Sequence, residues 1–191
     1  MADITAHTTT TTDPTTLPLG PGRWELDAAH SRVGFSIRHL GVSKVRGTFG
    51  IFEVEFDVGT TLADTSVRAT IDVASVHTGV ADRDAHILAP DLLDVASRPR
   101  LEFVSTDIRA DGGDWLMRGD LTFGDVTAPI ELEVEFGGAE PFPLDQRVHA
   151  GFEARGKVRR SDYGLDFGMA EPVVGNVVTI ELDLQFLAPE A

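Results

Sequence analysis

Histidine and serine side chains are the first residues of this sequence that could carry chemistry. His30 and Ser31 are adjacent, as a base and a nucleophile might be. Neighbouring residues on a strand point to opposite faces, so this pair cannot act together unless the chain bends at Ala28-Ala29. Structural hydrogen bonding is the simpler interpretation, and the sequence has no Gly-x-Ser-x-Gly elbow. No catalytic residue is predicted.

A metal site is the second kind of chemistry to consider. Asp82, Asp84 and His86 carry side chains that can ligate metals. On a helix, however, residues two apart are rotated by roughly 200°, so these three do not converge. The six histidines show no His-Glu-x-x-His spacing, and there is no cysteine. We therefore predict neither a metal nor another cofactor.

The charged residues limit the choice of partner. The 31 acidic and 16 basic residues give a net charge of −15, which argues against a nucleic acid or an anionic membrane surface as the main partner. The basic residues nevertheless gather in two segments, which could mark an anion site, although solvated or ion-paired strand faces are the commoner explanation. The segments contain Arg23, Arg32, Arg38, Lys44 and Arg46, and then Arg155, Lys157, Arg159 and Arg160.

Alternation of apolar and polar residues predicts the elements that must position these side chains. Two alternating runs, 33–37 and 52–58, flank a basic, glycine-bearing bend. A short strand at 24–27 precedes them, and further runs predict strands at 67–73, 101–104, 115–123, 130–136, 148–154 and 178–186. Residues 80–88 predict one short helix, and the Thr- and Pro-rich residues 1–22 predict a disordered tail.

Short turns between consecutive strands indicate an all-β, antiparallel domain over residues 23–188. About eight strands with one apolar face each can close as a barrel or stack as a sandwich. A barrel of this size is either filled by its own side chains or holds a small ligand. Periodicity alone leaves these choices open.

Several sequence blocks resemble the YceI-like family. They are W-E-L-D-x-x-H-S-x-V-x-F-x-I-R-H-L at 24–40, R-G-T-F at 46–49, H-T-G-V-A-D-R-D-A-H-I-L at 77–88, G-D-L-T-F-G-D-V-T-A-P-I at 119–130 and R-R-S-D-Y-G-L at 159–165. The resemblance implies a lipocalin-like antiparallel β-barrel of about eight strands, with a short helical insert and a hydrophobic tunnel for a polyisoprenoid chain. Leu92-Leu93 departs from the aromatic residues common in the family, and we expect this to alter the tunnel mouth.

On this resemblance, the inward apolar residues become the expected tunnel lining. A polar head group is then expected at a mouth formed by Arg38, His39, Arg83, His86 and Arg160, because guanidinium groups match phosphate geometry. The alternative to head-group binding is an ordinary structural role, in which Arg83 pairs with Asp84 or caps a barrel end. The expected lining residues are Val33, Phe35, Ile37, Phe52, Val54, Phe56, Ile71, Val73, Phe103, Met117, Leu121, Phe123, Ile130, Leu132, Val134, Phe152, Ile180, Leu182 and Leu184.

The expected function is non-enzymatic binding, storage or transport of a long isoprenoid lipid, quinone-like or phosphorylated. One alternative is an enzyme that acts on such a lipid with His39 or His86 as base. Another is a stress-related interaction module that uses Glu131, Glu133 and Glu135. We expect a cytoplasmic protein without stable membrane insertion, because the start lacks the features of a signal peptide. The resemblance also permits a homodimer.

Overall fold

The computed structural model describes residues 16–168 and 173–190, and most of them belong to one 11-stranded antiparallel sheet. Within these described ranges there is a single α-helix, α1 (Ala81–Ile87), which lies between the sixth and seventh strands, within one residue of each predicted bound. The strands are β1 (Gly22–Leu26), β2 (Arg32–His39), β3 (Ser43–Phe49), β4 (Phe52–Val58), β5 (Ser66–Asp72), β6 (Val76–His77), β7 (Arg100–Asp111), β8 (Asp114–Phe123), β9 (Val126–Pro141), β10 (Val148–Arg159) and β11 (Val174–Leu187).

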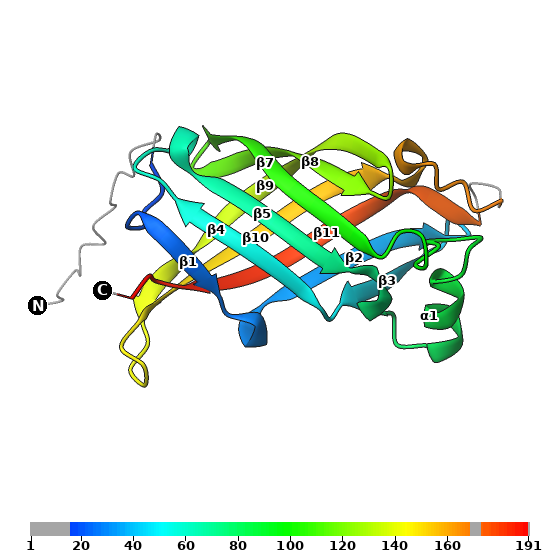
Figure 1. Ribbon diagram of the computed structural model, residues 1–191, viewed down its shortest axis with the longest axis horizontal. Helices are drawn as coiled ribbons and strands as arrows, with labels where there is room; N and C mark the ends of the chain where they lie inside the picture. Colours follow the sequence, from blue (N-terminus) through cyan, green and yellow to red (C-terminus); the bar gives the residue numbers. More distant parts are fainter. Residues whose placement is uncertain (1–15, 169–172, 191) are drawn as a thin grey trace, which may run out of the picture.

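The sheet closes on itself because the long strand β11 has two partners along one edge. At its C-terminal end it pairs with β1, with Leu26 opposite Phe186, and further back it pairs with β2, with Phe35 opposite Ile180. The order β1-β4-β5-β7-β8-β9-β10-β11 therefore returns to β1, and the strands wrap around a long axis (Figure 1). The predicted antiparallel barrel with a short helical insert is confirmed.

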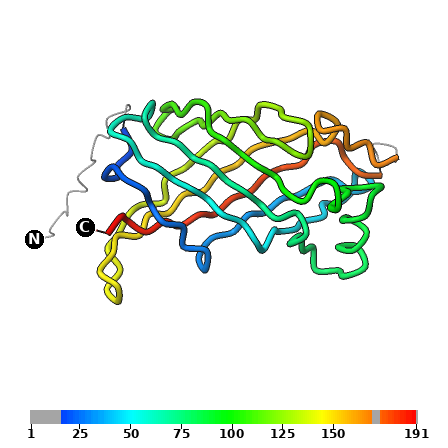
Figure 2. Tube along the Cα trace, viewed as in Figure 1, coloured from blue at the N-terminus to red at the C-terminus, as the bar shows by residue number. Residues whose placement is uncertain are grey.

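The two ends of the barrel differ. Trp24, Phe56, Val58, Ala150 and Phe186 form a buried cluster at the end that carries β1 and the last residues of β11. The helix α1 and the short 3-10 turn Arg160–Tyr163 lie at the opposite end (Figures 1 and 2). One end is thus filled by apolar side chains, while the other carries polar and charged residues.

Two predicted elements need correction. The basic bend between the first two alternating runs contains a further strand, β3, which pairs along the whole of β2. It was missed because Gly47 interrupts the alternation between Val45 and Phe49; the Phe35 ring lies against Gly47, where a β-carbon would clash with it. In addition, β5 ends at Asp72, so Val73 begins a 3-10 turn instead of extending the strand.

The predicted disordered tail is only partly within the described residues. Residues 1–15 lie outside them. In the described remainder, Leu17 and Leu19 pack against the cluster around Trp24, and the Trp24 indole donates a hydrogen bond to the Gly20 carbonyl at 3.0 Å. The segment from Leu17 onwards is therefore part of the packed barrel end, because its two leucines cover the aromatic residues.

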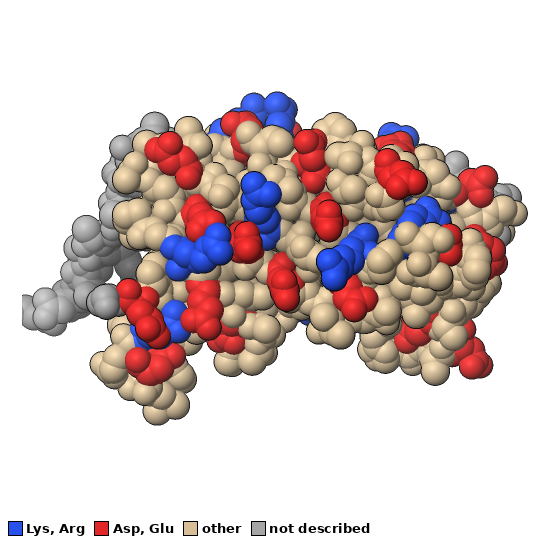
Figure 3. Space-filling model, in the orientation of Figure 1, with Lys and Arg blue, Asp and Glu red and all other residues tan. Residues whose placement is uncertain are grey.

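Acidic and basic side chains alternate over much of the outer surface. On the face shown in Figure 3, Lys and Arg lie among Asp and Glu rather than in a block of one sign. Arg23 is bidentate to Asp57, with nitrogen–oxygen distances of 2.9 and 2.8 Å. Glu131, from the predicted acidic interaction face, accepts a 2.9 Å bond from Arg118. These pairs fit the ordinary solvated-surface interpretation.

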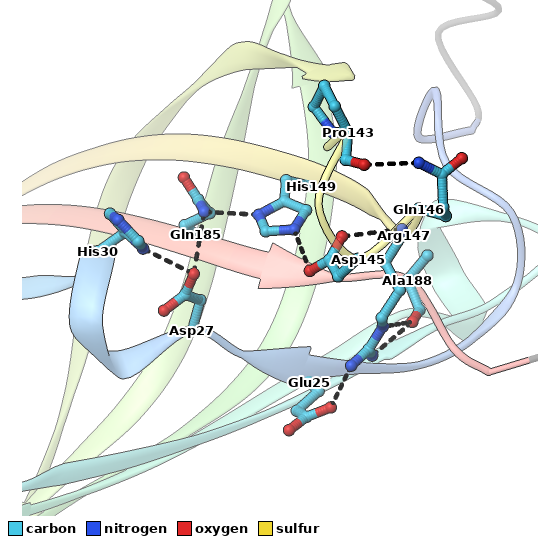
Figure 4. Close-up of polar contacts among 10 residues, drawn as sticks. All are labelled: Glu25, Asp27, His30, Pro143, Asp145, Gln146, Arg147, His149, Gln185 and Ala188. Atoms are coloured by element: carbon cyan, nitrogen blue, oxygen red, sulfur yellow. Dashed lines mark hydrogen bonds and ion pairs between the residues drawn. The ribbon is translucent and has the colours of Figure 1, made fainter. Parts of the chain in front are cut away.

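A chain of polar contacts fastens the junction of β1, β10 and β11 (Figure 4). Asp27 bonds the His30 ring at 2.8 Å and accepts from the Gln185 amide at 3.1 Å. The Gln185 amide also contacts one nitrogen of the His149 ring at 2.8 Å. The other ring nitrogen of His149 bonds Asp145 at 3.0 Å. His30 lies in the 3-10 turn Ala28–His30 instead of on a strand. His30 thus bonds Asp27, and the Ser31 hydroxyl accepts from the Gln185 backbone N–H at 2.9 Å. A purely structural role for this pair remains a prediction.

Candidate lipid-binding tunnel

The barrel encloses a cavity of about 510 Å³ with an almost wholly apolar wall. Its volume falls within the range of roughly 300–1,000 Å³ typical of small-molecule sites. Alternate residues of each strand point into this space, as strand geometry requires. The barrel is therefore not filled by its own side chains, which periodicity had left undecided.

The structure places the predicted lining residues at the cavity wall with one exception. Val73 is fully buried, but it packs in the core cluster at the 3-10 turn after β5 and does not reach the cavity. Its inclusion was wrong because strand alternation was extended one residue too far. Contact of the other residues with a ligand remains a prediction.

Several wall residues were missed by the sequence reasoning. Val45 and Phe49 belong to the missed strand β3, while Val67, Ala69 and Val178 lie within the predicted strands 67–73 and 178–186. The alternation within those two strands was sufficient to find the last three. A second group comes from loops, where no periodic signal exists: Leu165, Phe167 and Val173. Leu92 and Leu93, which were expected at the tunnel mouth, also line the cavity.

Arg160 is the most unusual side chain of the cavity wall. It is only 6% exposed, although it carries a charge. Its guanidinium donates to the carbonyl oxygens of Gly175 and Val174, each at 3.2 Å, and of Leu165. No carboxylate within residues 16–168 and 173–190 pairs with it. A buried positive charge thus stands at the α1 end of an apolar cavity.

Tyr163 lies three residues after Arg160 and also lines the cavity. Its hydroxyl is buried and has no hydrogen-bond partner among the described residues. Burial, together with the negative charges of Asp162 and Asp120, raises the pKa of Tyr163 to about 12. The hydroxyl therefore stays protonated at neutral pH and keeps a free donor.

The other predicted head-group residues border the same end of the cavity. Arg38, His39, Arg83 and His86 all line it. Arg83 does not pair with Asp84; it donates to the hydroxyl and carbonyl oxygens of Thr78 at 2.7 and 2.8 Å. Hydrogen bonds from Thr78 hold the pKa of Asp84 below its usual range. The structure brings the five predicted residues to one opening, which we call the mouth.

Other site types receive no support from the described part of the chain. Over residues 16–168 and 173–190, no cluster of three or more His, Asp or Glu could hold a metal ion. In the same ranges, no helix has the length and apolar character needed to cross a membrane.

Comparison with known proteins agrees with this geometry. The sequence profile of the YceI-like domain matches residues 24–186. The chain belongs to the YceI-like family. Protein YceI of Escherichia coli O17:K52:H18 is 38% identical over 159 residues, which cover 81% of this chain and 82% of that protein.

Solved structures of similar fold extend the comparison of this YceI-like chain. Burkholderia cenocepacia BcnA has a TM-score of 0.73 at 22% identity, covering 84% of this chain and 99% of BcnA. A polyisoprenoid binding domain from Saccharophagus degradans, implicated in plant cell wall breakdown, has a TM-score of 0.60 at 18% identity and covers 89% and 100% of the two chains. At these identities the likeness shows the YceI-like barrel fold.

Proposed function

We propose that this protein binds a long isoprenoid lipid and stores or carries it in the barrel. The observation that carries the proposal is the apolar cavity with the buried guanidinium of Arg160 at its mouth. Such a cavity matches a molecule with a long apolar tail and one small polar end. Membership of the YceI-like family and the fold shared with a polyisoprenoid binding domain point the same way.

Burial of the lipid tail is the main source of the proposed affinity. Each methylene group that leaves water contributes about 0.8 kcal/mol, so eight chain carbons contribute about 6 kcal/mol. Association costs roughly 4–15 kcal/mol in lost freedom, so a longer tail is needed for tight binding. Affinity should therefore rise with tail length more steeply than it changes with the head group.

The head group is expected to be an acceptor of hydrogen bonds. Arg160 has three donor groups engaged by carbonyl oxygens, and a guanidinium has five N–H donors, so donors remain for a ligand. The Tyr163 hydroxyl, which has no partner among the described residues, is a further donor on the cavity wall. Both a quinone-like carbonyl and a phosphate offer acceptors for these groups.

Native mass spectrometry of the gently purified protein tests this proposal directly. We expect a mass increment that disappears after organic extraction, and an extract that contains an isoprenoid. A protein that carries no lipid, and that takes up none when incubated with a quinone or a polyprenyl phosphate, would contradict the proposal.

A further inference from the structure

The two basic segments of the sequence come together on the outer face of the barrel beside the mouth. Lys157 of β10 is opposite Thr179 of β11, which is opposite Ser36 of β2, and Ser36 is in turn opposite Arg46 of β3. These residues alternate with the cavity-lining ones, so they face away from the cavity. Lys157 and Arg46 are exposed, whereas Ser36 between them is only 2% exposed. One row across four strands thus joins Lys157 to Arg46, which are far apart in sequence.

Three more basic residues extend this row toward the mouth. Arg159 lies two residues after Lys157, and Arg38 and Lys44 form a cross-strand pair at the end of the β2–β3 hairpin. Like charges directly opposite each other on a sheet repel. The pair is therefore unfavourable for the isolated protein. We call the five residues Arg38, Lys44, Arg46, Lys157 and Arg159 the basic face.

The basic face differs from the other exposed basic residues of the same two sequence segments in its lack of counter-ions. All five side chains are exposed, and none forms an ion pair within residues 16–168 and 173–190. By contrast, Arg23, Arg32 and Arg155 of the same two sequence segments pair with Asp57, Asp183 and Glu153. The unpaired cations are thus confined to the mouth end of these strands.

Apolar side chains project from the same region. At the tip of the β2–β3 hairpin, Leu40 is 54% and Val42 81% exposed, and Val177, opposite Arg159, is 41% exposed. Leu40 also has a φ of 53°, in the left-handed region that asparagine or glycine adopts more easily than leucine. In the isolated barrel, Leu40 therefore contributes little burial of apolar surface, and its backbone conformation is unfavourable for a leucine.

We propose that the basic face and the apolar tip of Leu40 and Val42 form a docking surface for an anionic phospholipid bilayer. Phosphate groups would neutralise the basic residues, and the tip would enter the headgroup region, as amphipathic membrane-surface elements do. This inference rests on the proposed lipid function, because docking would bring the mouth to the bilayer from which a lipid enters. It departs from the expectation, based on the net charge of −15, that an anionic membrane surface is not the main partner.

The net charge of −15 does not prevent this contact. At physiological ionic strength, charges further apart than about 8 Å are largely screened, so a bilayer at the basic face responds mainly to the charges nearest to it. One row further from the mouth, Arg155 is opposite Glu181. In the row after that, Asp183 is opposite Arg32. Further from the mouth along these strands, mixed charge thus resumes in the first row beyond the basic face.

Vesicle co-sedimentation of the full chain tests the proposal. We expect binding to phosphatidylglycerol vesicles, little binding to phosphatidylcholine vesicles, and release by high salt. The variant Lys44→Glu/Lys157→Glu should lower the partition coefficient onto these vesicles at least about tenfold. The reason is that each basic residue near an anionic surface raises this coefficient about fivefold. Leu40→Asn should weaken binding without harming the fold, because asparagine tolerates the left-handed conformation.

A matched charge reversal on another face serves as the control. Arg68→Glu/Arg109→Glu changes the net charge equally, at exposed positions of β5 and β7, and should bind vesicles like the original protein. Equal loss in both double variants, or no binding to phosphatidylglycerol, overturns the docking surface. Binding of polyglutamate without binding of vesicles would also overturn it, in favour of an acidic protein partner. Vesicle binding by a protein with no isoprenoid would leave the docking surface standing and reject the proposed function.

Discussion

The Arg160 guanidinium lies over the ring of Phe167, with 4.7 Å between its central carbon and the ring centroid. This cation–π contact stabilises a positive charge without a carboxylate. The remaining contacts of Arg160 are backbone carbonyls from β11 and from the loop after the 3-10 turn. One side chain therefore joins β11 to the loop after the 3-10 turn and supplies a buried positive charge at the mouth.

Replacing Arg160 should destabilise the protein. In Arg160→Met the carbonyl oxygens of Leu165, Val174 and Gly175 lose their donor, and we expect the free energy of unfolding to fall by about 2–3 kcal/mol. Urea denaturation measures the change. Arg159→Met, at the exposed neighbouring position, should change it by less than about 0.5 kcal/mol. Equal effects of both substitutions would show that the carbonyl contacts contribute no stability.

Filling the cavity should remove the bound lipid. Ala69 lines the wall on β5, so Ala69→Trp places an indole where we expect the tail, and the lipid-bound fraction in native mass spectrometry should fall severalfold. The matched variant Ala63→Trp adds the same side chain at an exposed position between β4 and β5 and should keep its lipid. Circular dichroism of both variants checks the fold. Full lipid occupancy in folded Ala69→Trp would place the ligand outside this cavity.

A methyl group at Gly119 should strain the barrel wall. A β-carbon there would lie 2.6 Å from the Val104 carbonyl oxygen and would also overlap the Phe103 ring. Such overpacking costs about 1–3 kcal/mol, so Gly119→Ala should lower the thermal midpoint by several degrees. Gly151→Ala, where nothing lies within 4 Å of the added carbon, is the control. A Gly119 variant as stable as the Gly151 variant would mean that Phe103 can move without cost.

Acid should weaken the junction of β1, β10 and β11 through Asp27. Burial alone raises the pKa of Asp27, but the hydrogen bonds and charge of His30 and the bond from Ala29 outweigh it, so the pKa lies below its ordinary value. A carboxyl group with a lowered folded pKa stabilises the fold fully above its unfolded pKa of about 3.9. That contribution is lost as the pH falls through the folded pKa.

The measurement is the free energy of unfolding between pH 6 and pH 2.5 in urea. Asp27→Asn should be less stable at pH 6 by about 1 kcal/mol, and its stability should depend less on pH in the acid range. Glu190→Gln, at an exposed position near the C-terminus, provides the comparison. Identical acid slopes for Asp27→Asn and the original protein would rule out this role for Asp27.

The strand pattern of the sequence was sufficient to predict most of the fold. Runs such as Ile130, Leu132 and Val134 alternate without interruption, and their inward direction follows from strand geometry alone. The strand β3 escaped prediction because Gly47 has no side chain to show which face it belongs to. Val73 was misplaced because a 3-10 turn can follow a strand without any break in the apolar pattern.

By itself, the sequence determined the inward and outward faces of the strands, because alternation is a local property of the backbone. It also carried the family blocks that place Arg83 and Arg160 among the mouth residues. Only the tertiary structure decided that the barrel is hollow, because the space left inside depends on how strands distant in sequence pair and tilt. Strand register also decided that Lys157 and Arg46 share one row, since no local signal relates two segments that are separated by most of the chain.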